Sequence, residues 1–197
     1  SPTPVNGTFQ PGQTISFCYH IAEFSQENTN WLQGVVPILG SGWDMGSLTV
    51  TPPPSCMNAA VNGEWVWMTN VTTPDGNQTG FFYDYTPGSA AGPDGDISNN
   101  YGDNCDGNIN NNDWNFCWTI ETVDCVQDAD LSVSIMNYAD GETGSWDDVA
   151  CTSDAQYDFA STLTCCPLPD TATVPASCFG FCDGQATVDG LGVTGTG

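Results

Sequence analysis

Two stretches of sequence, TISFCYHIA (residues 14–22) and WNFCWTIET (residues 114–122), show the pattern that decides the fold. In the first, apolar side chains occupy every second position from Ile15 to Ile21. The second repeats this spacing from Trp114 to Ile120. A period of two predicts a β-strand with one buried and one exposed face. Both stretches are therefore expected to be strands that contribute aromatic side chains to a core.

Each of these strands carries a cysteine between two aromatic residues, on the face opposite the aromatic stripe. If the strands are neighbours, Cys18 and Cys117 could bridge directly. The pairing is a hypothesis, because this many cysteines allow many connectivities. The ten candidate disulfide cysteines are Cys18, Cys56, Cys105, Cys117, Cys125, Cys151, Cys165, Cys166, Cys178 and Cys182.

Further strands are expected elsewhere, and no window shows a sustained helical period. Alternating patterns recur at residues 64–71, 130–136 and 157–163, and shorter apolar runs at 31–39 and 80–85 indicate buried or edge strands. Pro37 favours an edge position, because proline cannot donate to a β-ladder. The fold class expected is all-β, an immunoglobulin-like or jelly-roll-like antiparallel β-sandwich with disulfides.

The charge balance excludes several kinds of partner. The chain has 24 acidic residues and no Lys or Arg, so its formal net charge is −24. Nucleic acid and direct membrane insertion are not expected, because both modes of binding draw on basic or long apolar segments. No acidic side chain can pair with Lys or Arg. A buried carboxylate here needs N–H donors, a metal ion or a proton.

The cysteines indicate an oxidising, extracellular compartment. Zinc is the rival explanation, but the chain contains no CxxC pair and only one histidine, His20. The sequence shows no signal peptide and no apolar run of transmembrane length. Ser1 is therefore expected to be the start of a processed chain or of an excised fragment.

Composition divides the chain into three parts. Residues 1–166 are expected to form the disulfide-rich sandwich, and residues 167–177 (PLPDTATVPAS) a Pro-rich linker. Residues 178–197 begin a second, small β repeat that is too short to bury a core of its own. Within the first part, residues 90–113 are dense in Gly, Asp and Asn and are expected to form long loops.

Several strings together resemble one known group. They are NWLQGVVPILGSGWD (residues 30–44), PPSC (53–56), GFFYD (80–84), the GDNCDG loop followed by NFCWTI, and GSWDDVAC ending in LTCC. This combination resembles a module of very large gliding-motility-associated, type IX-secreted, adhesin-like surface proteins of Bacteroidota. The final segment, CFGFCDGQATVDGLGVTGTG, resembles the opening of an SprB-type repeat.

The resemblance implies a non-catalytic structural or adhesive module of a bacterial cell-surface protein or filament. Its partners would be neighbouring domains of the same long chain, with like modules or surface glycans as further candidates. It also implies O-glycosylation at Thr171, since Asp170-Thr171-Ala172 resembles the Asp-Thr-hydrophobic site that Bacteroidota modify.

Calcium is the one candidate cofactor. Calcium takes six to eight oxygen ligands, and Asp-rich loops supply them. The candidate ligands are Asp94, Asp96, Asp103, Asp106 and Asn108. Their spacing does not fit the EF-hand pattern, and Asp/Asn/Gly runs are also ordinary turn formers. A weaker second set is Asp140, Glu142, Asp147 and Asp148.

The tryptophans raise an alternative function, a carbohydrate-binding adhesion module. Trp31, Trp43 and Trp146 lie among Gly, Asn and Asp in loop-like contexts and are the candidate sugar-stacking residues. For the others, packing in the core is the expected role. No catalytic constellation is found around His20 or elsewhere, so an enzyme is not expected.

Overall fold

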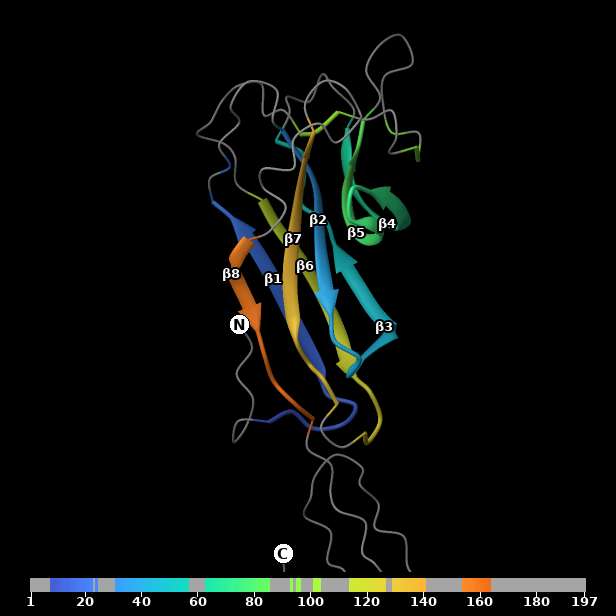
Figure 1. Cartoon of the computed structure of the whole chain (residues 1–197), viewed down its shortest axis with the longest axis vertical. Helices are drawn as coiled ribbons and strands as arrows, with labels where there is room; N and C mark the ends of the chain where they lie inside the picture. The colour runs from blue at the N-terminus through green and yellow to red at the C-terminus, as the bar shows by residue number, and fades with distance from the viewer. Residues whose placement is uncertain are drawn as a thin grey trace, which may run out of the picture.

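The computed structural model describes residues 8–22, 24, 31–56, 63–85, 93, 95–96, 101–103, 114–126, 129–140 and 154–163. These residues form two antiparallel β-sheets packed face to face, as expected for a β-sandwich (Figure 1). All elements within them are strands, turns or irregular segments, and none is a helix.

The smaller sheet has three strands in the order β1-β6-β3. These are β1 (Thr14–Ile21), β6 (Trp114–Thr122) and β3 (Trp43–Thr51). β1 pairs with β6 along its full length without a register shift. Its side chains alternate strictly between exposed and buried positions, so the sequence prediction for both strands is confirmed.

The larger sheet has five strands in the order β4-β5-β2-β7-β8. They are β4 (Glu64–Thr73), β5 (Gly76–Asp84), β2 (Trp31–Leu39), β7 (Val133–Asp140) and β8 (Asp154–Phe159). β2 lies between two partners and is central, so an edge position is wrong for the strand as a whole. Pairing with β5 ends at Val35, however, and Pro37 pairs only with β7. At Pro37 the strand is locally an edge, where a missing N–H is tolerated.

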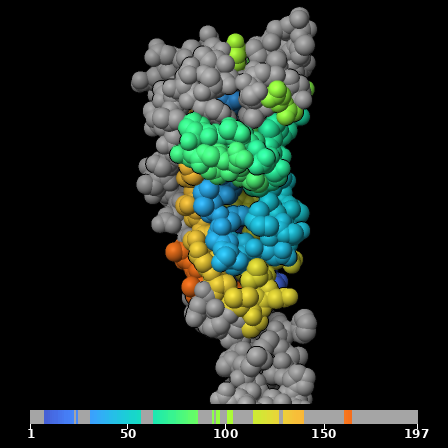
Figure 2. All heavy atoms as spheres, turned by 45° about the vertical axis from the view of Figure 1, so that its right-hand side comes forward, coloured from blue at the N-terminus to red at the C-terminus, as the bar shows by residue number. Residues whose placement is uncertain are grey.

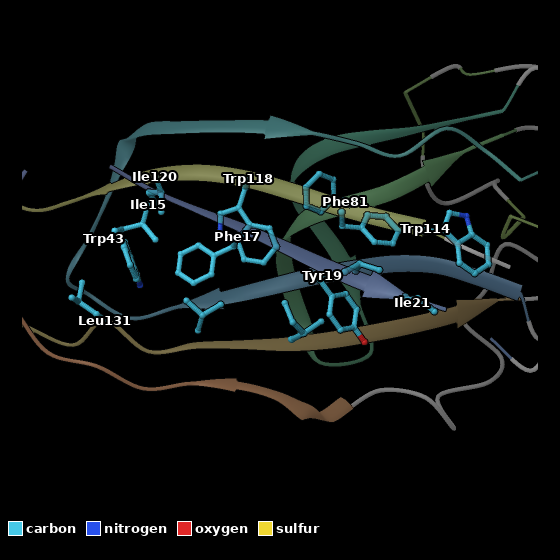
Figure 3. Close-up of a cluster of buried hydrophobic side chains, with 14 of the residues drawn as sticks. Ile15, Phe17, Tyr19, Ile21, Trp43, Phe81, Trp114, Trp118, Ile120 and Leu131 are labelled. Atoms are coloured by element: carbon cyan, nitrogen blue, oxygen red, sulfur yellow. The ribbon is translucent and has the colours of Figure 1, made fainter. Parts of the chain in front are cut away.

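Aromatic side chains from both sheets fill the space between them (Figure 3). Phe17 of β1 stacks on Trp118 of β6 at a centroid distance of 5.3 Å, and Phe81 of β5 meets Phe116 at 5.3 Å. Asn137 of β7 also faces inward, and its side-chain N–H₂ donates to the Tyr19 hydroxyl at 2.9 Å. The predicted inward stripes of the strands thus build one continuous core.

The predicted bridge between β1 and β6 is confirmed. Cys18 and Cys117 are directly opposite each other in the ladder and form a disulfide that links residues 99 apart in sequence. Cys18 is exposed and Cys117 half-buried, so the bridge lies on the outer face of the smaller sheet. It staples two strands without occupying core volume.

A second, smaller apolar cluster covers the outer face of the larger sheet. The tip of the β4–β5 hairpin curls over this face after a bulge between Met68 and Val71, where Asn70 adopts φ 61°. Val71 and Phe82 pack there with Val36 and Tyr138, which come from β2 and β7. Figure 2 shows the hairpin (green) as a band beside β2 and β3.

The two ends of the sandwich differ. At one end, here called the basal end, Phe9 and Leu163 form a parallel bridge, so the chain enters and leaves the sandwich side by side (Figure 1). Short backbone-bonded turns close this end, for example Gly42 N–H to the Asp130 carbonyl at 2.7 Å. The opposite, distal end is where β1, β3, β5 and β7 end and where β2, β4 and β6 begin.

The strand predictions were least accurate at β3, β7 and β8. β3 was not predicted, because most of its side chains are exposed and a bulge between Asp44 and Thr49 interrupts its pattern. β7 begins at Val133 and runs to Asp140, later than predicted, and β8 begins earlier than predicted, at Asp154.

Candidate functional site

The most unusual side chain among the described residues is Asp103, at the distal end. It lies in the connection between β5 and β6 and is fully buried, with 0% exposure. Its backbone N–H donates to the Leu32 carbonyl at 2.8 Å, which forms an antiparallel bridge with the first residues of β2. Nearby, Tyr101 N–H donates to the Tyr85 carbonyl at 3.2 Å. Residues 101–103 are thereby held against the larger sheet.

Three N–H groups converge on one oxygen of the Asp103 carboxyl group. Oδ2 accepts from the indole Nε1 of Trp65 at 2.8 Å, from the indole Nε1 of Trp114 at 2.9 Å and from the backbone N–H of Cys56 at 3.1 Å. The donors come from β4, β6 and the segment that follows β3. One side chain therefore ties both sheets and two connections together.

The other oxygen faces a hydroxyl group. Asp103 Oδ1 lies 2.8 Å from Ser55 Oγ, and Ser55 Oγ lies 2.9 Å from the hydroxyl of Tyr83, which is fully buried on β5. The Tyr83 hydroxyl lies against Gly63, and a Cβ at that position would overlap it. The cluster Asp103, Ser55, Tyr83, Trp65 and Trp114 is called the carboxyl cluster below.

Burial governs the electrostatics of the carboxyl cluster. Desolvation raises the pKa of Asp103 above its usual value, and the hydrogen bonds from Trp114, Cys56, Trp65 and Ser55 lower it by less. This is the situation that the composition requires, since no Lys or Arg exists to neutralise a buried carboxylate. What the arrangement can do chemically is hold, or release, one proton inside the core.

A second buried acid lies in the same region. Asp84, at the end of β5, is 3% exposed, and its Oδ2 accepts from the backbone N–H of Gly95 at 2.8 Å. The Asp84 side chain thus bonds to the backbone of Gly95 in the β5–β6 connection, and Asp103, itself in that connection, bonds to the backbone of Cys56 and Leu32 outside it. These acidic residues serve to attach a polar connection to the sandwich.

The candidate calcium ligands are only partly within the described chain. Asp96 is exposed, whereas Asp103 turns its oxygens to N–H and O–H donors inside the core. Asp94, Asp106 and Asn108 lie outside the described residues, as do Glu142, Asp147 and Asp148; of Asp140, only the backbone is described. The described residues contain no group of three metal-ligating side chains. Calcium binding by the others stays a prediction.

The candidate sugar-stacking tryptophans have three different outcomes. Trp43 was expected in a loop, and this is wrong: it begins β3, is 3% exposed and packs edge-on against Phe17 at 5.4 Å (Figure 3). Trp31 begins β2 and is half-buried, with its ring 6.2 Å from that of Tyr101. Trp146 lies outside the described residues.

Two more cysteines are in disulfides, Cys56 and Cys125. The cysteines outside the described residues are Cys105, Cys151, Cys165, Cys166, Cys178 and Cys182, and the same holds for Thr171, the linker and the predicted repeat. Disulfides are compatible with a compartment outside the cytoplasm. Within the described ranges, nothing meets the length and hydropathy that a membrane-crossing helix needs.

The partners of Asp103 were not predicted from the sequence. Trp65 and Trp114 were assigned to the core by their periodicity, which is correct, but periodicity does not reveal where an indole N–H points. The useful signal was composition: a chain without Lys or Arg must satisfy any buried carboxylate with neutral donors or a proton.

No protein family, no curated protein and no solved structure matches this chain.

Proposed function

We propose that this chain is a non-catalytic structural and adhesive module of a large secreted bacterial cell-surface protein or filament. The observation that carries the proposal is the disulfide-stapled sandwich, in which a covalent bridge lies on the outer face of β1 and β6. Such a staple stabilises a domain outside the cell, where it must keep its fold without chaperones.

The asymmetry of the two ends supports an adhesive role. The chain enters and leaves at the basal end, through the neighbouring residues Phe9 and Leu163. The long connections leave from the distal end, and one of them carries the Asp-rich residues 90–113. A module attached in this way has these strand ends on the side away from its attachment point, and loops that connect strands often carry binding residues.

The first test is localisation on intact bacteria that produce the protein. An antibody raised against the folded chain is expected to label whole cells, and brief external protease treatment is expected to remove the label. Labelling that appears only after the cells are lysed would contradict the proposal. An antibody against a cytoplasmic protein, which should label lysed cells only, provides the control.

A second candidate function is carbohydrate binding, and one observation favours it. Trp31 and Tyr101 form a half-buried aromatic pair at the distal end, with their ring planes tilted by 55°. Aromatic faces that are partly open to solvent are suited to contact the apolar faces of sugars. Trp43 no longer belongs to this candidate, because its ring is buried.

A glycan-binding screen separates the two functions. Under the carbohydrate-binding alternative, Trp31→Ala or Trp146→Ala abolishes binding to a neutral glycan. In both variants, the thermal midpoint stays near that of the wild type. Absence of binding to a broad panel of glycans by the folded, oxidised chain would leave the structural role as the sole candidate of the two.

A further inference from the structure

The strands at the edges of the two sheets differ in how they are protected against pairing with another chain. Within the described residues these strands are β1 and β3 in the smaller sheet and β4 and β8 in the larger one. An open edge presents a row of backbone N–H and C=O groups, and proteins protect it with charged side chains, proline, bulges or short strands. Lysine, a common protecting residue, does not occur in this chain.

The edges other than β1 carry such protecting features. β3 is bulged between Asp44 and Thr49, and β4 is bulged between Met68 and Val71. β8 has six residues, and two of them are aspartates. Where β5 leaves β2, the locally open edge of β2 carries Pro37. Each of these edges is therefore a poor template for a regular added strand.

β1 has none of these features. Its eight residues, TISFCYHI, include no Asp, Glu or Pro, and they pair with β6 without a register shift. Thr14, Ser16 and Cys18 are exposed on this strand. β1 is thus a regular edge without acidic residues, in a protein whose formal net charge is −24.

Two observations show which backbone groups of β1 point toward its open side. Thr122 N–H donates to the Gln13 carbonyl at 3.0 Å, and these two residues are opposite each other, one step before the first pair of the ladder. Hydrogen-bonded and non-hydrogen-bonded pairs alternate in an antiparallel ladder, so Ser16 and Cys18 belong to non-hydrogen-bonded pairs. The Cα atoms of Cys18 and Cys117 are 4.1 Å apart, in accordance with the shorter spacing of such pairs. The N–H and C=O groups of Ser16 and Cys18 therefore point away from β6.

We propose that β1 is a strand-pairing site for β1 of a second copy of this chain, in antiparallel orientation. The pairing joins the two smaller sheets into one continuous sheet. A second copy is the partner that the charge distribution favours at this edge. Two chains of net charge −24 repel each other, so they associate best through an edge that carries no acidic side chain. Pairing at β1 does not depend on where the protein is localised.

The alternation of β1 fits pairing with itself. With Phe17 of one copy opposite Phe17 of the other, Ser16 of one copy lies opposite Cys18 of the other. The outward N–H and C=O groups of these two residues can then exchange hydrogen bonds, and the aromatic side chains of both copies stay on the core face. Strands of this length bury little area, so the dimer is expected to be weak.

The first test is the oligomeric state of the oxidised, full 197-residue chain, measured by sedimentation equilibrium. We expect a dimer whose share rises with protein concentration. We also expect it to rise between about 0.02 M and about 0.5 M sodium chloride, because salt screens the repulsion between two acidic copies. A chain that stays monomeric up to about 1 mM protein at the higher salt concentration would overturn the proposal.

The matched variants are Ser16→Glu and Thr119→Glu. The two hydroxyl oxygens are 2.9 Å apart on the outer face, so each variant removes the same hydrogen bond and adds the same charge. Thr119 lies on β6, one strand away from the open edge. We expect Ser16→Glu to weaken dimerisation several-fold and Thr119→Glu to weaken it much less, because like charges repel most strongly between adjacent strands. Equal effects of the two substitutions would contradict the proposal.

Amide hydrogen exchange locates the contact in the wild type without any substitution. The N–H groups of Ser16 and Cys18 point to the open side and are expected to exchange rapidly in a dilute, monomeric sample. At high protein concentration and high salt their exchange is expected to slow. The N–H of Ile15 belongs to a pair bonded to β6 and is expected to be protected in both samples. Dimerisation that leaves Ser16 and Cys18 in rapid exchange would place the contact on another surface and overturn the proposal.

Discussion

Gly63 lies where the carboxyl cluster meets the start of β4, and its lack of a side chain is required there. A Cβ at this position would overlap the Tyr83 hydroxyl, which is fully buried and bonded to Ser55. We expect Gly63→Ala to destabilise the fold by about 1–3 kcal/mol through overpacking. Urea unfolding measures the effect, with the exposed Thr69→Ala as a control that should change little. Equal stability of the two variants would show that Tyr83 can move aside.

Individual residues were predictable where a single rule dominates. Period-two alternation places four apolar side chains on the buried face of β1 and β6, and all four are in the core: Ile15, Phe17, Trp118 and Ile120. Trp43 was misplaced, because flanking Gly and Asp residues indicate a loop, whereas its ring fills the basal end of the core and its Nε1 donates to the Ser132 carbonyl at 3.2 Å. Asp103 illustrates a second limit. Its donors are spread along the chain from Ser55 to Trp114, and only the fold brings them together.

The β1–β6 pair is the element whose contribution can be isolated most cleanly. The Cys18–Cys117 bridge lies on the outer face, so removing it leaves no cavity in the core. We expect Cys18→Ala/Cys117→Ala to lose about 2–5 kcal/mol of stability, because the bridge constrains a long loop in the unfolded chain. Chemical denaturation at fixed pH measures the loss. A loss well below this range would mean that the unfolded chain is already constrained by the other disulfides.

Strands in which buried and exposed side chains alternate regularly were predicted most accurately. β1 and β6 alternate without interruption, and their predicted bounds match the structure closely. β3 exposes most of its side chains, and its bulge places Asp44, Gly46 and Ser47 in local hydrogen bonds that resemble a turn. The order of strands in the two sheets was not predictable, because β1 and β6 are joined by contacts between residues far apart in sequence.

The net charge of −24 acts on the molecule as a whole. With no basic side chains, mutual repulsion of the carboxylates opposes compaction, and salt should relieve it. Raising sodium chloride from about 0.01 M to about 1 M shortens the Debye length from about 30 Å to about 3 Å. We expect Tm to rise over this range. A Tm that falls with salt would indicate that attractive electrostatic contacts outweigh the repulsion, and calorimetry at constant pH distinguishes the two.

The fold class of this chain was easier to predict from the sequence than its function. Aromatic periodicity and cysteine content are sufficient for a disulfide-linked sandwich, and the structure confirms it. Neither property specifies a ligand, because uniform negative charge gives every acidic cluster the same appearance. The carboxyl cluster became recognisable only in the structure, where Asp103 is buried and accepts hydrogen bonds from several elements.

The parallel bridge between Phe9 and Leu163 has a mechanical consequence. If the chain on either side of the sandwich is pulled in opposite directions, the tension passes through the Phe9–Leu163 bridge at the basal end. The ladders between β1 and β6 and between β2 and β7 lie outside this path. The two sheets would therefore carry little of the applied force. The disulfides would protect the module from heat and proteases more than from mechanical unfolding.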